Sequence, residues 1–188
     1  LKYAPIDSFK THVVSTNSYI NFDLLTFSEV NSIINLKRIN DVRYINKLFE
    51  SINARMPIGG VYVNFFETKN QRRKRILHKF PPIINYIYYS FDFVLKRILP
   101  KFALTKGIYF ILTRGQNRVL TKAETYGRLY SCGFEILDEL ACEGYQYFVA
   151  IKSQKPLYPE RPTYGPLIRL TRLGKNGKQI KVFKLRTM

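Results

Sequence analysis

Five cationic side chains near the C-terminus could hold phosphate groups. They stand in the stretch RLGKNGKQIKVFKLRTM (172–188), which has no acidic residue, and they are Arg172, Lys175, Lys178, Lys184 and Arg186. Arginine and lysine form strong, charge-assisted hydrogen bonds with phosphate oxygens. Asn176-Gly177 separates two apolar-rich runs and so predicts a tight turn between two strands. A basic tail for nucleic acid, an ordinary surface hairpin and the opening of a further domain would all have this pattern.

A second cationic cluster lies in the middle of the chain. Its members are Arg72, Arg73, Lys74 and Arg75, and an apolar, aromatic run from Ile83 to Leu99 follows it. The segment 69–106 contains ten Lys or Arg residues and one acid, Asp92. Asp92 and Lys96 stand at i,i+4, which favours a helix that ends before Pro100.

Three interpretations of this basic, aromatic segment stay open. As a lid or side subdomain, it would pack its rings on the core and leave its cations in water. As a nucleic-acid-binding module, it would stack bases on those rings, but the sequence has no RNP-like, helix-turn-helix or KH signature. As a membrane-surface contact, it would set residues 72–75 against anionic lipid and place rings at the headgroup level. The candidate rings are Tyr86, Tyr88, Tyr89, Phe91 and Phe93. The apolar density favours the membrane hypothesis over nucleic acid.

Composition excludes several classes of protein. The chain has 188 residues, a net charge of +18 and 46% hydrophobic residues, which excludes a disordered chain. Neither the run from Ile83 to Leu99 nor the second apolar run, GIYFILT (107–113), reaches the roughly 18–20 residues that span a bilayer. Cys132 and Cys142 are too few for a disulfide framework, so we interpret them as small buried thiols in a reducing cytoplasm. His12 and His78 are isolated, and no metal site is expected. The chain begins with Leu1 and shows no signal peptide, and we expect both ends to be cuts in a longer protein.

The first 67 residues have the pattern of a βαβ unit. THVVST (11–16) and NSIINL (31–36) predict strands, and IGGVYVNFFE (58–67) is a glycine turn followed by a third. Residues 40–57 predict a helix between them, with Asn40 or Asp41 as its cap and Pro57 at its end. The apolar stripe of this helix consists of Val42, Ile45, Leu48, Phe49, Ile52 and Met56. A helix between strands with short loops favours a mostly parallel sheet.

A second helix and two strands complete the predicted sheet. Thr121 and Glu124 predict a capping box, and Gly133 stands where a helix ends. Residues 134–140 and 145–152 predict strands of an antiparallel pair. The expected fold is α/β: an incomplete Rossmann-like, mostly parallel sheet over 1–153, with a helical insertion at about 69–118. A proline-rich linker, 154–166, and a C-terminal β-hairpin, 167–188, follow it.

This arrangement resembles the C-terminal half of a class I, S-adenosylmethionine-dependent methyltransferase. The resemblance covers roughly residues 30–152 and rests on PIGGVYV (57–63), CGFEILDEL (132–140) and YQYFVAIK (145–152). That family binds its cofactor with a glycine-rich loop after the first strand, whereas this chain has no glycine before Gly59. We therefore interpret Asn40 and Asp41 as a helix cap rather than as catalytic groups. A degenerate methyltransferase-like domain is one alternative for the function.

The C-terminal stretch resembles the opening of the bacterial sugar transferases, the monotopic polyprenyl-phosphate glycosyl-1-phosphate transferases. The matching motifs are Gly165-Pro166, Arg172-Leu173-Gly174, Gly177-Lys178 and Phe183-Lys184-Leu185-Arg186-Thr187-Met188. The resemblance implies transfer of a sugar-1-phosphate from a nucleotide sugar to a polyprenyl phosphate, with Mg²⁺, at the cytoplasmic face of the bacterial inner membrane. It also implies phosphate or lipid-headgroup contacts for the five cations Arg172, Lys175, Lys178, Lys184 and Arg186. The acidic catalytic pair of that family is expected beyond Met188, so this chain holds no catalytic residue and no cofactor of its own and is expected to be inactive. The other alternative is a basic module that binds nucleic acid or a membrane surface.

Overall fold

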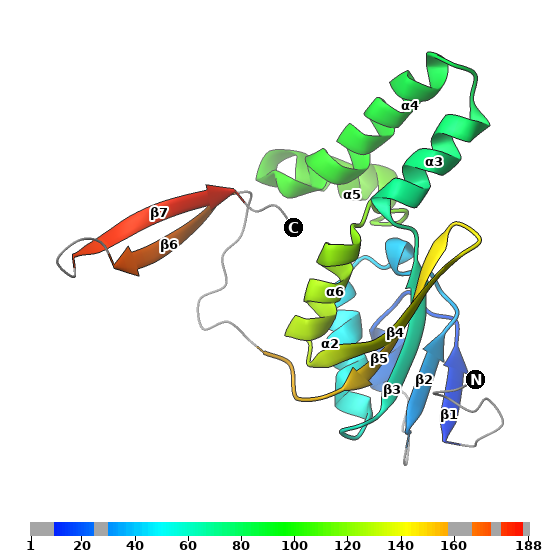
Figure 1. The fold of residues 1–188 in the computed structure, drawn as a ribbon, viewed down its shortest axis with the longest axis vertical. Helices are drawn as coiled ribbons and strands as arrows, with labels where there is room; N and C mark the ends of the chain where they lie inside the picture. The colour runs from blue at the N-terminus through cyan, green and yellow to red at the C-terminus, as the bar shows by residue number, and fades with distance from the viewer. Residues whose placement is uncertain (1–9, 25–29, 158–166, 174–177, 186–188) are drawn as a thin grey trace.

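A five-stranded sheet with the order β1-β2-β3-β5-β4 forms the main body of the protein (Figure 1). The structure is a computed structural model that describes residues 10–24, 30–157, 167–173 and 178–185. The strands are β1 (Thr11–Val14), β2 (Ser32–Asn35), β3 (Val61–Phe66), β4 (Phe134–Cys142) and β5 (Tyr145–Lys152). β1, β2 and β3 are parallel, and β5 pairs antiparallel with both β3 and β4. The predicted α/β class with an open, mostly parallel sheet is confirmed.

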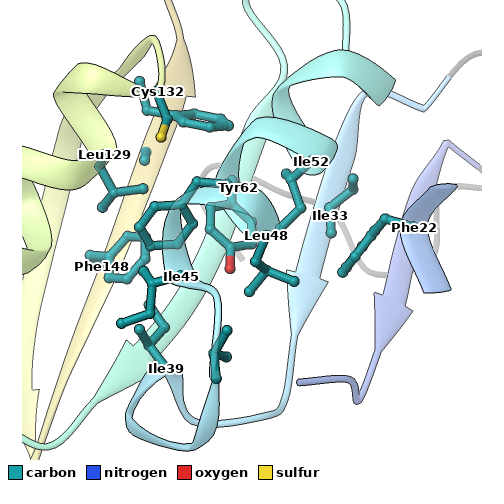
Figure 2. Close-up of a cluster of buried hydrophobic side chains, with 14 of the residues drawn as sticks. Phe22, Ile33, Ile39, Ile45, Leu48, Ile52, Tyr62, Leu129, Cys132 and Phe148 are labelled. Carbon is teal, nitrogen blue, oxygen red and sulfur yellow. The ribbon is translucent and has the colours of Figure 1, made fainter. Parts of the chain in front are cut away.

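Three helices pack on one face of this sheet and bury the core. They are α1 (Ile20–Leu24), α2 (Ile45–Arg55) and α6 (Lys122–Ser131). Their apolar side chains meet those of β2, β3 and β5 in one cluster, in which Tyr62 lies between Leu48 and Phe148 (Figure 2). The Tyr62 ring contacts Phe148 with centroids 5.7 Å apart. Burial of these large side chains is the main favourable contribution to folding.

The predicted stripe of α2 is correct, but its predicted cap is wrong. All six stripe residues are buried. The helix starts at Ile45, and its N-cap residue, Tyr44, makes no side-chain capping bond. Asn40 and Asp41 belong instead to a short 3-10 turn, η1 (Ile39–Asp41). A sequence pattern that identifies a buried stripe does not fix the first turn of a helix.

The helical insertion between β3 and α6 extends beyond one end of the sheet (Figure 1). It contains α3 (Lys69–Lys79), α4 (Ile84–Phe93), the π-helical segment η2 (Val94–Ile98), the 3-10 turn η3 (Leu99–Lys101) and α5 (Ala103–Thr113). The α-helical part ends before Pro100, as predicted, and Pro100 sits in the 3-10 turn, where its missing N–H leaves no α-helical bond unmade.

The C-terminal strands β6 (Leu167–Leu173) and β7 (Gln179–Leu185) form a separate antiparallel pair, the predicted hairpin. The predicted turn at Asn176-Gly177 and most of the predicted linker lie outside the described residues. The interpretation of both cysteines as buried is half correct. Cys132 is buried and its pKa is raised to about 12 by burial, whereas Cys142 is exposed.

Gly133 ends α6 with a left-handed backbone, as predicted. It also lies where the end of α6 closely approaches the segment after β5. Its φ is +83°, and an added Cβ would lie 2.2 Å from the carbonyl oxygen of Gln154. Asn53 Nδ2 donates to the carbonyl oxygens of both Cys132 and Gln154 at 2.9 Å, which fixes that approach.

We predict that Gly133→Ala lowers the free energy of unfolding by about 3 kcal/mol or more, because the clash adds to the left-handed strain. Gly144→Ala is the matched control: its φ is +79° and an added Cβ meets nothing within 4 Å, so we expect a loss of only about 1 kcal/mol. Urea unfolding of both variants measures the difference, and equal losses would contradict the proposed clash.

Candidate functional site

The end of β3 holds a buried carboxylate, Glu67, around which the site is built. Asn40 is fully buried. It accepts a hydrogen bond from the backbone nitrogen of Glu67 at 2.7 Å and donates to the Glu67 carbonyl oxygen at 2.9 Å. It also donates to the carbonyl oxygen of Arg118 at 2.8 Å. Asn40 therefore joins the end of β3 to the loop before α6, which is a structural role that sequence analysis missed.

The cationic cluster lies on α3, whose first turn is capped. The backbone nitrogen of Gln71 donates to Thr68 Oγ1 at 3.2 Å, and the backbone nitrogen of Thr68 donates to Gln71 Oε1 at 2.9 Å. These two bonds form a reciprocal capping box. The signal was present in the sequence as T-K-N-Q at 68–71, but the sequence analysis did not use it. The helix buries Arg72 and leaves Arg73 and Lys74 exposed.

Arg72 is the centre of a buried ion-pair network. Its Nε and Nη2 donate to the two carboxylate oxygens of Asp92, each at 2.7 Å. Its Nη1 donates to Asn117 Oδ1 at 2.6 Å and to Glu67 Oε2 at 3.4 Å. The prediction that Arg72 contacts lipid is therefore corrected: the side chain is 3% exposed and fastens α3 to α4, to β3 and to the loop before α6.

Two further cations surround these carboxylates. Arg75 donates to Glu67 Oε1 at 2.6 Å and to Glu67 Oε2 at 3.1 Å. Lys96 Nζ lies 3.0 Å from Asp92, so the predicted i,i+4 pair is confirmed. Burial opposes ionisation of Asp92, but hydrogen bonds from Arg72 and Lys96 outweigh it and hold the pKa of this carboxyl below its ordinary value. Asp92 is therefore a carboxylate at neutral pH.

Helix α4 has its polar side inward and its apolar side outward. Asn85 and Asp92 are buried, and Asn85 Nδ2 donates to the carbonyl oxygen of Leu77 at 3.1 Å. The opposite side carries large apolar residues at i, i+3, i+4 and i+7, and their exposed fractions are 56% for Ile84, 66% for Ile87, 44% for Tyr88 and 66% for Phe91. A helix of a soluble domain usually has the reverse arrangement. We call these four residues the α4 stripe.

Helix α5 presents a second exposed apolar stripe, again at helical spacing. Leu104 is 94% exposed and Ile111 82%, and Ile108 and Leu112 are also exposed. In the described part of the chain, thirteen of the twenty-five exposed large apolar side chains lie between residues 83 and 112. Exposed apolar residues so concentrated indicate a contact with something other than water.

The four predicted membrane residues on α4 differ in their exposure to solvent. Tyr88 and Phe91 belong to the α4 stripe, whereas Tyr89 and Phe93 are half-buried. The guanidinium carbon of Arg73 lies 6.0 Å from the centroid of the Tyr89 ring, and Lys69 Nζ lies 5.3 Å from that of Phe93. The half-buried rings therefore support cations of α3 rather than forming the outer surface.

The predicted phosphate contacts belong to the hairpin, apart from this network. Arg172 and Lys178 are exposed, and Lys184 lies in β7. Lys175 and Arg186 lie outside the described residues.

The polar groups after β1 and at the end of β2 are hydrogen-bonded to one another. Asn35 Oδ1 accepts from the backbone nitrogen of Thr16 at 3.1 Å, and Asn35 Nδ2 donates to the Thr16 carbonyl oxygen at 2.9 Å. Thr16 Oγ1 in turn accepts from the backbone nitrogen of Ser18 and from Asn21 Nδ2. These polar groups therefore satisfy one another and fix the loop after β1 against the end of β2.

Two features are absent from the described residues. These residues contain no group of three or more His, Cys, Asp or Glu residues placed to hold a metal ion. None of the helices in the described ranges is long and apolar enough to cross a membrane.

Comparisons with known proteins give a likeness of fold alone. No protein-family model matches the chain, and no curated protein is significantly similar in sequence. Among solved structures, the chain is similar to an O-methyltransferase family 2 protein from Planctomyces limnophilus in complex with apigenin, with 10% identity and a TM-score of 0.39 over 70% of this chain and 32% of that one. It is also similar to human N-acetylserotonin methyltransferase in complex with SAM, with 16% identity and a TM-score of 0.40 over 71% and 32%. The chain thus spans about a third of the length of these structures, and scores this low identify no activity.

The prediction of a sugar transferase is contradicted by these comparisons. No family model matches residues 165–188 or any other part of the chain, and three of the similar solved structures are methyltransferases or O-methyltransferase family proteins, whereas none of those printed is a sugar transferase. An ordered run of Gly, Lys and Arg in a short basic hairpin did not suffice to identify a family. The predicted Mg²⁺, nucleotide sugar and polyprenyl phosphate rested on that resemblance alone.

We predict that Asp92→Asn lowers the stability of the insertion by about 3 kcal/mol, because Arg72 then stays buried without its carboxylate. Hydrogen exchange of the α3 and α4 amides measures this loss. A carboxyl whose pKa is lowered by folding contributes stability above its unfolded pKa and loses it as the pH falls through the folded value. Protection in the wild type should therefore fall below about pH 4, and Asp92→Asn should lack this part of the pH dependence.

The control variant is Glu139→Gln. It changes an exposed carboxylate on β4 that pairs with Lys122 on α6. It should leave exchange in α3 and α4 unchanged. If Asp92→Asn exchanged like the wild type, the network would not hold the insertion.

Proposed function

We propose that the insertion binds the surface of an anionic membrane and that the methyltransferase-like sheet serves as its scaffold. The observation that carries this proposal is the reversed orientation of α4. Its charged and amide groups are buried in a network with α3, while Ile87 and Phe91 face outward. Water is a poor environment for such a stripe, and the boundary between headgroups and acyl chains is a favourable one.

The lengths of the helices support contact with the interface rather than passage through it. α4 has ten residues and α5 eleven, so each extends about 15 Å. The hydrocarbon core of a bilayer is about 30 Å thick. Isoleucine and leucine predominate at the most exposed positions, Leu104 and Ile111 among them, and aliphatic side chains neither stack on bases nor bind phosphate.

The charge of α3 supports an anionic surface as the partner. This helix has six Lys or Arg residues among eleven and no acid. Arg73, Lys74 and Lys79 are exposed, and each cation near such a surface contributes about 1 kcal/mol of attraction. Apolar stripes beside a cationic helix are the combination that binds anionic interfaces.

The first prediction from this proposal concerns the α4 stripe. We expect residues 1–188 to co-float with vesicles of phosphatidylglycerol and phosphatidylcholine at physiological salt. Ile87→Ser should weaken binding about tenfold, because a buried isoleucine contributes about 1.5–3 kcal/mol. Ile58→Ser is the matched control, since Ile58 is 65% exposed and Ile87 66%, and Ile58 lies in the turn before β3.

Absence of co-flotation would refute the proposal. An equal effect of the two serine substitutions would show that the α4 stripe has no special role. Binding of the protein to single-stranded oligonucleotides, without binding to vesicles, would favour the nucleic-acid alternative.

The second prediction concerns α3. Arg73→Glu combined with Lys74→Glu should weaken binding to anionic vesicles by about two orders of magnitude or more, because about 1 kcal/mol of attraction per cation turns into repulsion. The effect should shrink as salt rises, since exposed charges are screened. Binding that does not change with salt, or with this double substitution, would contradict a role for the cationic face.

A further inference from the structure

A small cationic cavity lies between α3 and α4, beside the α4 stripe. It has a volume of about 70 Å³. Its polar lining consists of Arg72, Arg75, Lys79, Tyr88, Lys96 and Asn117. Pockets for drug-sized ligands measure about 300–1,000 Å³, so this cavity suits a group of a few atoms rather than a nucleotide.

The network around the cavity carries an excess of positive charge. Two of the four lining cations, Arg72 and Arg75, pair with Glu67, and the guanidinium of a fifth cation, Arg38, lies 3.6 Å from the same carboxylate. Three carboxylates oppose these five cations. They are Asp41, which pairs with Arg38 at 3.0 Å, Glu67 and Asp92. The excess is therefore two charges.

The cations of the cavity divide into supports and available donors. Arg72 donates from Nε, Nη1 and Nη2 to protein oxygens, so it holds the cavity walls together rather than offering donors to a ligand. Arg75 uses Nε and Nη2 for Glu67, and its Nη1 remains to donate. The ammonium group of Lys79 lies 5.7 Å from the centroid of the Phe80 ring, a contact that leaves its three N–H donors for an anion.

The position of Tyr88 connects the cavity with the apolar surface. Tyr88 lines the cavity and is also a member of the α4 stripe, and its ring packs on Phe80 with centroids 4.7 Å apart. An anion in the cavity would therefore lie next to one member of the α4 stripe. In a bilayer, a headgroup phosphate stands in this relation to the acyl chains below it.

We propose that this cavity binds a phosphomonoester, whose two negative charges match the excess of the network. Its size fits one phosphate group, and the remaining donors come from Arg75, Lys79, Tyr88 and Lys96. A phosphomonoester lipid and a soluble phosphomonoester offer the same chemistry. The lipid-borne form of this inference rests on the proposed membrane function.

The test uses residues 1–188 with two variants of α3, Lys79→Gln at the cavity and Lys74→Gln outside its lining. Vesicles contain either phosphatidic acid, a phosphomonoester, or phosphatidylglycerol, a phosphodiester, adjusted to equal surface potential. Glycerol 3-phosphate titrated calorimetrically supplies the soluble form. We expect the wild type to prefer phosphatidic acid at least fivefold. Lys79→Gln should remove this preference, while Lys74→Gln should weaken both kinds of vesicle binding equally.

The outcomes separate this inference from the proposed function. Vesicle binding without any preference for phosphatidic acid would overturn the phosphate site and leave the membrane function standing. Binding of glycerol 3-phosphate that depends on Lys79, without binding to any vesicle, would overturn the membrane function and support the site with a soluble ligand. Equal losses of the preference in both glutamine variants would mean that only general charge acts, and would also overturn the site.

Discussion

The insertion depends on one interaction, the buried ion pair between Arg72 and Asp92. Two parallel hydrogen bonds at 2.7 Å fix α4 against α3 in one rotational setting. Taking two charges out of water is costly, and a pair of apolar residues would stabilise such a contact at least as well. We interpret the pair as a device for orientation. An apolar contact would draw the α4 stripe inward, whereas the ion pair keeps Ile87 and Phe91 at the surface.

The sheet provides the fixed end of this arrangement. Parallel strands bring their carboxyl ends to one edge, where loops from different strands meet and where open α/β folds place their sites. Here Glu67 follows β3 at that edge, and Asn40 after β2 holds its backbone through two hydrogen bonds. The same carboxylate binds Arg72 and Arg75 on α3. An unbroken series of hydrogen bonds and ion pairs therefore joins the sheet to α3, and α3 to the helix that carries the α4 stripe.

The sequence predicted the elements whose signals are local. The α2 stripe, the strands and Gly133 followed from periodicity and from the conformational freedom of glycine. The network was not predictable, because Asp92 lies 20 residues from Arg72, and Asn117 a further 25. The membrane hypothesis expected rings of this segment at a surface, but periodicity alone did not predict that α4 is reversed, since an apolar stripe normally indicates a buried face. Of the predicted membrane residues, Tyr88 and Phe91 lie on the surface and Arg72 does not.

The depth of α4 in a bilayer tests the central claim most directly. The chain has no tryptophan, so Phe91→Trp introduces a single tryptophan on the α4 stripe, whose emission can be excited selectively over that of the tyrosines. Tyr44→Trp introduces one at an exposed position before α2. We predict that anionic vesicles shift the emission of the first variant to shorter wavelength and that lipids brominated on their acyl chains quench it. The second variant should show neither effect. Emission of Phe91→Trp that stays that of a water-exposed indole, in protein bound to vesicles, would contradict the account.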